Sequence, residues 1–271
     1  MMEPGIYSDL SNDIYHNDPA ISRSGLMMFY DSPYKYWANY LNPLRPAKKS
    51  TPAMEFGSAF HTAILEPHLF SDTYTIMPEK VLLKDVGREI YDDYKEVVAL
   101  VEESNRIILS YEEGVLIGKM GKALQKHEAL DLIQGAVYEQ SYFWEDKDSG
   151  LMVKARPDIL HDNMIVDLKT IVSANSRYYQ RTMVESWYHV QGAMIREGIR
   201  ELTGKDISNV INICIEKTYP FEIGIKIISE EALEAGRKIF KSVCVDLKSA
   251  IVHNNWKSYE PETVELPTWL K

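Results

Sequence analysis

The chain has 271 residues, of which 45% are hydrophobic and 26% are charged, and this balance excludes disordered, collagen-like and low-complexity proteins. Thirty lysines and arginines against forty aspartates and glutamates give a net charge of −10, so a nucleic-acid partner would need a local basic patch. The two cysteines, Cys214 and Cys244, form no CxxC motif, which excludes a disulfide framework and a zinc ribbon.

The sequence shows no signal-peptide pattern and no membrane-spanning segment. Its first residues are acidic and polar, and no stretch approaches the ~20 apolar residues of a membrane span. We therefore expect a soluble, cytoplasmic protein without a membrane partner. No repeat or flexible linker divides the sequence, which favours a single domain over 1–271. Within it, a helical N-terminal part (about 20–135) would precede a sheet core (about 137–228).

The N-terminal part is predicted to be helical. Ser22 or Ser24 would cap a first helix, and Ser32 with Pro33 would begin a second one. Between Ser32 and Met54 there are four basic residues and no acidic one, so a phosphate backbone could lie there. Further helices are expected over 55–66, about 86–109 and 114–127. The helix over 86–109 is rich in acidic residues, which is typical of a solvated face.

The pattern then changes to strands. Segments 137–144, 151–160 and 164–169 are rich in β-branched and aromatic residues and are separated by turn signals, which predicts a β-meander. Two helices (about 175–184 and 186–203), two strands (210–215 and 221–228) and a closing helix (about 230–253) follow. This order predicts a mixed α/β domain, in the α+β sense, with a mixed central sheet flanked by helices.

The segment 156–158, Arg-Pro-Asp, comes shortly before 167–169, Asp-Leu-Lys. Side chains alternate along a strand, so Asp167 and Lys169 share one face with Ile165. The preceding strand turns back on this one, so Asp158 can lie beside Asp167. Two carboxylates at the rim of a sheet suit Mg²⁺ or Mn²⁺. Such an ion can polarise a phosphodiester, and Lys169 could orient water or stabilise negative charge on phosphorus.

An Asp-x-Lys motif alone is weak, because an exposed cross-strand ion pair is the default explanation of an isolated match. Asp246 to Lys248 also matches, but in a predicted helix, where positions i and i+2 do not face each other. His61 follows small residues on a predicted helix, so it is a candidate metal ligand or, alternatively, a packed core histidine. Gln191 lies on a later helix, where a surface amide is the alternative. The phosphate loop, dinucleotide and α/β-hydrolase motifs are absent, and His127-Glu128 does not extend to HExxH.

Together these motifs resemble the PD-(D/E)xK nucleases of the RecB-like group, most closely the exonuclease VIII (RecE-type) nuclease domain of phages and prophages. The resemblance runs from about residue 20 to residue 200. It is carried by segments 22–37, 56–67, 139–144, 150–158, 166–170 and 188–193. It implies a restriction-endonuclease-like core and hydrolysis of phosphodiester bonds with Mg²⁺, for which Mn²⁺ can substitute. The closest relatives digest linear double-stranded DNA from 5′ to 3′ and leave 3′ single-stranded overhangs.

The resemblance also implies roles for individual residues. Lys169 corresponds to the catalytic lysine, and Gln191 to the glutamine of a QxxxY element whose tyrosine is replaced here by Ile195. Tyr188 is a nearby candidate for the missing ring, and Glu139 corresponds to a glutamate that either supports the site or binds metal. The implied ligands of a first ion, with a second ion sharing the aspartates, are His61, Asp158, Asp167 and the Leu168 carbonyl.

The resemblance further implies a ring-shaped homo-oligomer and a single-strand annealing protein as partner. Two alternatives stay open: a RecB-like nuclease of other polarity or single-strand preference, and a non-catalytic DNA-binding module. Too few cysteines are present for the iron–sulfur cluster of some relatives. Candidate contacts to DNA phosphates, chosen for their charge, are Lys35, Arg45, Lys48, Lys49, Arg177 and Arg181.

Overall fold

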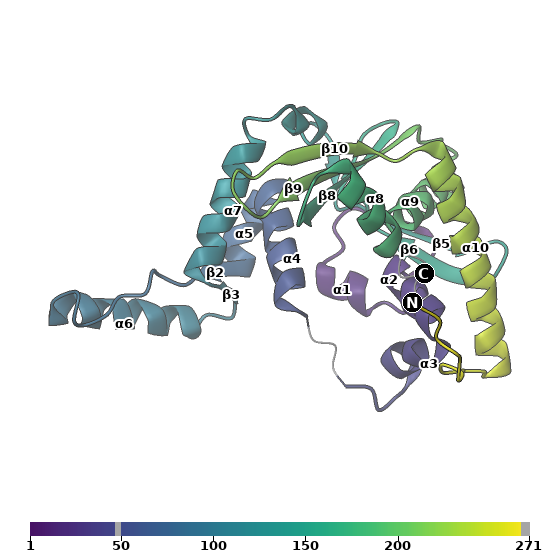
Figure 1. The fold of residues 1–271 in the computed structure, drawn as a ribbon, viewed down its shortest axis with the longest axis horizontal. Coiled ribbons are helices and arrows are strands. Elements are labelled where there is room, and N and C mark those ends of the chain that lie inside the picture. The colour runs from purple at the N-terminus through teal and green to yellow at the C-terminus, as the bar shows by residue number, and fades with distance from the viewer. Residues whose placement is uncertain (47–49, 267–271) are drawn as a thin grey trace.

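The computed structural model describes residues 1–46 and 50–266 and forms a mixed α/β fold (Figure 1). Among these residues no helix combines the length and the apolar character needed to cross a membrane. The N-terminal elements are β1 (Gly5–Tyr7), α1 (Asn12–Asn17), α2 (Arg23–Asp31), α3 (Pro33–Tyr36), the π-helix η1 (Trp37–Leu41), α4 (Pro52–Leu65), α5 (Pro67–Thr73), β2 (Tyr74–Ile76), α6 (Arg88–Glu102), β3 (Ile107–Leu109), α7 (Tyr111–Leu124) and the 3₁₀-helix η2 (Glu128–Leu132). The remaining elements are β4 (Val137–Tyr138), β5 (Ser141–Asp146), β6 (Leu151–Ala155), β7 (Ile159–Leu160), β8 (Met164–Ile171), α8 (Ser176–Glu185), α9 (Tyr188–Thr203), β9 (Asn209–Glu216), β10 (Ile223–Ile227) and α10 (Glu230–His253).

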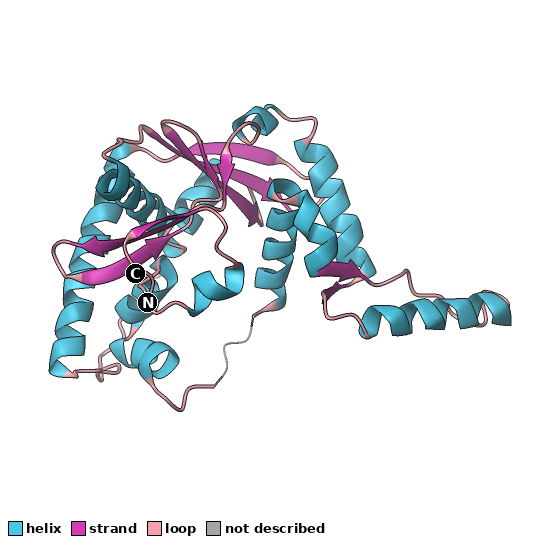
Figure 2. Cartoon of the chain, turned by 180° about the vertical axis from the view of Figure 1, so that it is seen from behind, coloured by secondary structure: helices cyan, strands magenta, loops and turns pink. Residues whose placement is uncertain are grey.

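The described strands form three sheets (Figure 2). The largest has the order β10-β9-β8-β7-β4, and only its β8–β9 pair is parallel, so the predicted mixed sheet is confirmed. A second sheet pairs β1, β5 and β6 in antiparallel fashion. The third consists of the short parallel pair β2 and β3.

The predicted β-meander is wrong, because two of its three strands break and change sheet. The backbone of Glu139 takes a positive φ of 48° between β4 and β5, a conformation that few residues adopt. Pro157 lies in the second break, between β6 and β7, where a residue without an N–H cannot continue a ladder. We call these two segments, 139–140 and 156–158, the strand crossings, because the chain passes there from one sheet to the other. The two crossings are in contact, since the Glu139 amide donates to the Asp158 carbonyl over 3.1 Å. They therefore bring residues 139 and 158 side by side.

The central strand β8 separates two hydrophobic cores, and its side chains alternate as predicted. Ile165 packs with residues of α9 and α10 on one face. Val166 and Leu168 pack on the other face with residues of α4 and α7. All three side chains are fully buried, which fixes the register of β8 and with it the faces of Asp167 and Lys169.

Helix ends follow the predicted capping signals in the N-terminal part. Ser22 caps α2 and Ser32 caps α3, each accepting a hydrogen bond from the amide three residues on. On α9, a Cβ at Gly192 would come within 2.7 Å of the Val210 side chain, and one at Gly198 within 2.6 Å of Trp144. These glycines let α9 lie against both sheets and so set how the helix is rotated.

The acidic helix predicted over 86–109 is shorter than expected. It ends at Glu102, and residues 107–109 instead form β3 beside β2. Helix α6 and the loops that flank it project from the rest of the molecule (Figures 1 and 2). None of its residues is buried.

Candidate active site

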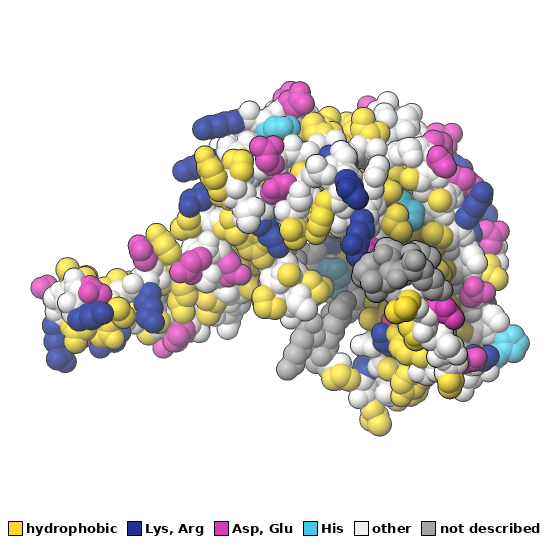
Figure 3. Space-filling model, viewed as in Figure 1, with side chains coloured by type: hydrophobic (Ala, Val, Ile, Leu, Met, Phe, Trp, Pro, Cys, Tyr) yellow, Lys and Arg dark blue, Asp and Glu magenta, His cyan; other side chains and the backbone are white. Residues whose placement is uncertain are grey.

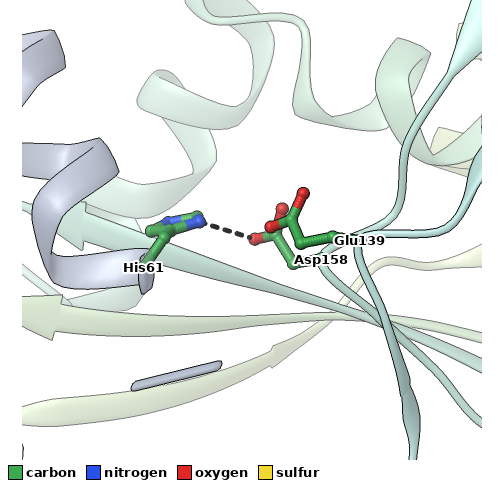
Figure 4. Close-up of side chains that lie close together, drawn as sticks. All are labelled: His61, Glu139 and Asp158. Carbon is green, nitrogen blue, oxygen red and sulfur yellow. Dashed lines mark ion pairs between the residues drawn. The ribbon is translucent and has the colours of Figure 1, made fainter. Parts of the chain in front are cut away.

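Three side chains with metal-ligating atoms converge where the two larger sheets meet. His61 comes from α4, Glu139 from the β4–β5 crossing and Asp158 from the β6–β7 crossing (Figure 4). One ligand atom of each lies within 4.8 Å of the others. The Nδ1 atom of His61 and the Oδ2 atom of Asp158 are 3.4 Å apart. An imidazole with two carboxylates is a donor set that divalent cations bind in proteins.

Burial and neighbouring negative charge raise the pKa of both carboxylates in this cluster. Burial raises the pKa of Asp158, and the neighbouring Asp167 carboxylate raises it further. Burial likewise raises the pKa of Glu139, with the charge of Asp158 as the second cause. Because a bound cation would compensate both effects, the donor set and its environment fit a divalent metal ion.

A second network of polar side chains lies beside this cluster. Asp167 and Lys169 form an ion pair, and the Gln191 side-chain amide donates to Asp167 Oδ1 over 2.9 Å. The Lys169 ammonium donates to Gln191 Oε1 over 3.3 Å. Burial opposes the charge on Lys169, but the carboxylates of Asp167 and Asp158 outweigh it and raise its pKa. Lys169 is therefore cationic, and Gln191 bridges it to Asp167 rather than pointing into solvent.

The two networks are joined through the backbone of β8. The Leu168 amide donates to Asp158 Oδ2 over 2.7 Å, so this carboxylate is held next to the Asp167–Lys169 segment. Asp158 thereby contacts His61 on one side and β8 on the other. The structure thus brings together the residues that the two motifs singled out.

Tyr188 is the aromatic residue at the lysine. Its ring centroid lies 4.8 Å from the Lys169 ammonium, a distance at which a cation is attracted to the ring face. It precedes Gln191 by three residues on α9, so both side chains lie on one helix face. Ile195 instead belongs to the hydrophobic core and is 1% exposed.

The metal-ligating cluster opens into a cleft of about 1000 Å³. Its walls come from α1, the start of α2, η1 and the segment after it, α4, the two strand crossings and α9. Residues that sequence reasoning did not assign also line it: Arg23, Glu66 and Arg156. Arg156 belongs to the Arg-Pro-Asp segment 156–158. Its guanidinium donates to Ser141 Oγ and to Asn12 Oδ1, over 2.7 Å each. No sequence signal identified Glu66, which ends α4.

The predicted phosphate-contacting residues are dispersed. Arg45 lines the cleft. Lys35, Arg177 and Arg181 are not among the described residues that line it; Lys35 pairs with Asp31 and Arg181 with Glu185. Lys48 and Lys49 lie outside the described residues. Their contacts with DNA stay predictions.

Comparison with known proteins identifies the fold and the family. A crystal structure from Eubacterium rectale, described as "Putative exonuclease", superposes with a TM-score of 0.62 over 94% of this chain and 96% of that one. The two are 15% identical, so this likeness concerns the fold alone. A search of curated proteins finds no match. The model of a family described as "PDDEXK-like domain of unknown function (DUF3799)" matches residues 22–265. The chain therefore belongs to this PD-(D/E)xK-like family and has the restriction-endonuclease-like fold that its motifs predict.

Proposed function

We propose that the protein is a metal-dependent exodeoxyribonuclease that digests linear double-stranded DNA from 5′ to 3′ and leaves 3′ overhangs. The observation that carries the proposal is the contact between the His61–Glu139–Asp158 cluster, which opens into the cleft, and the Asp167–Lys169–Gln191 network, of which Gln191 lines the cleft. Membership of a PD-(D/E)xK-like family supports hydrolysis of phosphodiesters. The likeness in fold to a protein described as "Putative exonuclease" supports attack at strand ends.

Mg²⁺, or Mn²⁺ in its place, is the proposed cofactor. His61, Glu139 and Asp158 would hold it, and Asp167 with the Leu168 carbonyl would complete the set of ligands for one or two ions. When bound, the metal would act as a Lewis acid on the scissile phosphate and lower the pKa of water. The resemblance left open whether Glu139 binds the metal or supports the residues that do. Its carboxylate is part of the metal-ligating cluster.

The chain's own residues would supply charge and orientation. Lys169 places a fixed positive charge where negative charge builds up on the phosphoryl oxygens. Asp167 and Gln191 hold its ammonium in position, so little reorganisation is needed when the phosphate reacts. Arg23 and Arg156 add positive charge to the cleft, which otherwise has several carboxylates.

The proposed location, assembly and partner are those that the RecE-type resemblance implies. They are a cytoplasmic location, a ring-shaped homo-oligomer that retains DNA, and a single-strand annealing protein that receives the 3′ overhang.

Linear duplex DNA labelled at the 5′ or at the 3′ end tests the proposal. We expect rapid release of the 5′ label with Mg²⁺ and none with EDTA. Lys169→Ala and Asp167→Ala should each lower the rate by at least ~100-fold while circular dichroism shows a retained fold. Lys248→Ala is the matched control, because it removes the lysine of another Asp-x-Lys match, in α10.

Other outcomes separate the alternatives. Rapid release of the 3′ label would replace the proposed polarity with its opposite. Internal cleavage, or digestion of single strands only, would indicate a different nuclease of this group. Tight DNA binding without cleavage in Mg²⁺ or Mn²⁺ would show a non-catalytic binding module.

A further inference from the structure

The N-terminal residues form a strap across the β1-β5-β6 sheet, which we define as residues 5–21. Strand β1 pairs with β5 at one edge of this sheet, and Ile21 forms a bridge to Val153 of β6 at the other edge. Between these attachments, Tyr15 of α1 packs on Phe143, so the strap covers one face of the sheet. The family match begins at residue 22, so the strap lies outside the matched residues.

A buried lysine holds the strap on this face. Lys154, in β6, is 4% exposed, and its ammonium donates to the backbone carbonyls of Tyr15 and Asp18, the latter over 2.7 Å. The ammonium also lies 4.8 Å from the centroid of the Tyr15 ring. Because a buried ammonium needs such acceptors, the end of α1 is fixed to β6.

Arg156 joins the two strand crossings through its side chain. It precedes Asp158 by two residues in one crossing, and its Nε donates over 2.7 Å to Ser141 Oγ at the other. Ser141 in turn follows Glu139 by two residues. This bridge lies beside the backbone hydrogen bond from Glu139 to Asp158, so the crossings are joined twice.

The strap supplies the remaining described partners of Arg156. The two terminal nitrogens of its guanidinium donate to Asn12 Oδ1 over 2.7 Å and to the Leu10 carbonyl over 2.8 Å. The guanidinium carbon lies 4.1 Å from the centroid of the Tyr15 ring, as in a stacked pair. Three N–H donors and one face of the guanidinium are therefore engaged within the protein, which fixes its orientation before any ligand enters the cleft.

We propose that Arg156 is a positioning residue for the metal-ligating cluster and that the strap holds it in place. By joining the crossings, Arg156 sets the separation of the Glu139 and Asp158 carboxylates to that which a divalent cation requires. Groups behind the ligands of a metal commonly have this role. The inference rests on the metal site of the proposed function.

The charge of Arg156 alone predicts the opposite effect on the metal. Seen in space-filling form, the molecule is hollowed beside α4, and Lys or Arg side chains lie near the hollow (Figure 3). A positive charge in the cleft repels a metal cation, so removal of a guanidinium that contributes charge only would tighten metal binding. Removal of a positioning residue weakens binding instead. The sign of the change therefore separates the two roles.

Electron paramagnetic resonance of Mn²⁺, with the full chain and without DNA, tests the proposal by separating free from bound ion. We expect Arg156→Gln and Arg156→Lys each to raise the dissociation constant for Mn²⁺ about tenfold or more. The lysine keeps the charge but lacks the planar fork that reaches three acceptors.

A variant of the strap makes the same test without changing any charge. Asn12→Leu removes one acceptor of the guanidinium and should raise the dissociation constant about threefold. In the Arg156→Gln background it should add little, because both changes act through one contact. Asn17→Leu is the matched control: it changes the same type of side chain on α1, also at the cleft, but at a position that forms no described hydrogen bond with Arg156. It should bind Mn²⁺ like the wild type.

Unchanged or tighter Mn²⁺ binding by either Arg156 variant overturns the proposal, and so does equal binding by Asn12→Leu and Asn17→Leu. Melting temperatures measured in parallel show whether each variant is folded. If the Arg156 variants do not fold, Asn12→Leu decides, and a wild-type dissociation constant for it overturns the proposal. A wild-type chain that binds no Mn²⁺ would overturn the metal site of the proposed function, and this inference with it.

Discussion

Tyr188 and Ile195 lie seven residues apart on α9, on either side of Gln191, and only one of them reaches the lysine. Tyr188 places its ring 4.8 Å from the Lys169 ammonium, whereas Ile195 packs in the core. The sequence pattern showed that the tyrosine of the QxxxY element is missing. It could not show which position compensates, because that depends on the rotation of α9, which close packing at Gly192 and Gly198 sets.

Replacing Tyr188 should lower catalysis without unfolding the protein. Tyr188→Leu removes the ring and should reduce kcat about twofold to thirtyfold, the range of cation–π attraction. Tyr188→Phe keeps the ring and should retain nearly the full rate. Steady-state kinetics on linear duplex DNA would show the loss mainly in kcat rather than in KM, since the ring positions Lys169. Equal losses in both variants would contradict this role.

How much of the site could be predicted differs from residue to residue. The spacing of Asp158, Asp167 and Lys169 indicated that they meet, because strand alternation and a reversal of the chain suffice for that. Glu66 and Arg23 could not be predicted as part of the cleft. They lie at the end of α4 and the start of α2, and only the packing of these helices brings them to the strand crossings.

At the scale of elements, the strand pattern was predicted and its division between sheets was not. Segments 137–144 and 151–160 have the residue types of continuous strands, and a break of two or three residues changes that pattern little. The break at Pro157 has a visible cause in the missing N–H. The positive φ of Glu139 has none in its residue type, so the crossing that brings Glu139 to the metal-ligating cluster appears only in the fold.

A buried ion network connects α10 to the β1-β5-β6 sheet and to α9. The Lys241 ammonium lies 2.5 Å from Asp146 Oδ1 and 2.6 Å from Glu197 Oε1. Lys241→Met would leave the buried Asp146 carboxylate without its cation, while Glu197 keeps its ion pair with Arg200, so the free energy of unfolding at pH 7 should fall by about 3–5 kcal/mol. Urea denaturation measures the loss. Lys238→Met, at an exposed position of the same helix, should change stability little.

The loss should also depend on pH. Burial alone would raise the pKa of Asp146, but Lys241 and Ser149 outweigh it and hold the pKa below its usual value. A carboxyl with a lowered pKa stabilises the fold above about pH 4 and loses this contribution as the pH falls through its folded pKa. The difference in free energy of unfolding between wild type and Lys241→Met should therefore narrow as the pH falls below about 4. A gap that stays constant would show that the ion pair is not its origin.

At the scale of the whole molecule, the projecting arm that carries α6 (residues 77–106) is expected to be separable from the rest of the fold. Because β2 and β3 are parallel, the chain must run back along the length of one strand, about 10 Å, to pass from the end of β2 to the start of β3. A linker of six Gly/Ser residues in place of residues 79–105 can span this distance. No residue of α6 is buried, so the shortened protein should melt within about 2 °C of the full chain. Differential scanning calorimetry checks this. A drop of 10 °C would mean that the arm belongs to the cooperative core.

The two strand crossings share one anchor, and this gives the site a built-in reporter. The Glu139 amide donates to the Asp158 carbonyl, and the Leu168 amide donates to its carboxylate. Both amide protons can exchange with deuterated solvent only when these bonds open. A cation that settles on Asp158 should slow exchange at both amides together, and Asp158→Asn should abolish this response to Mn²⁺. Deuterium uptake at two backbone positions would then rank metal ions by occupancy, without DNA and without turnover.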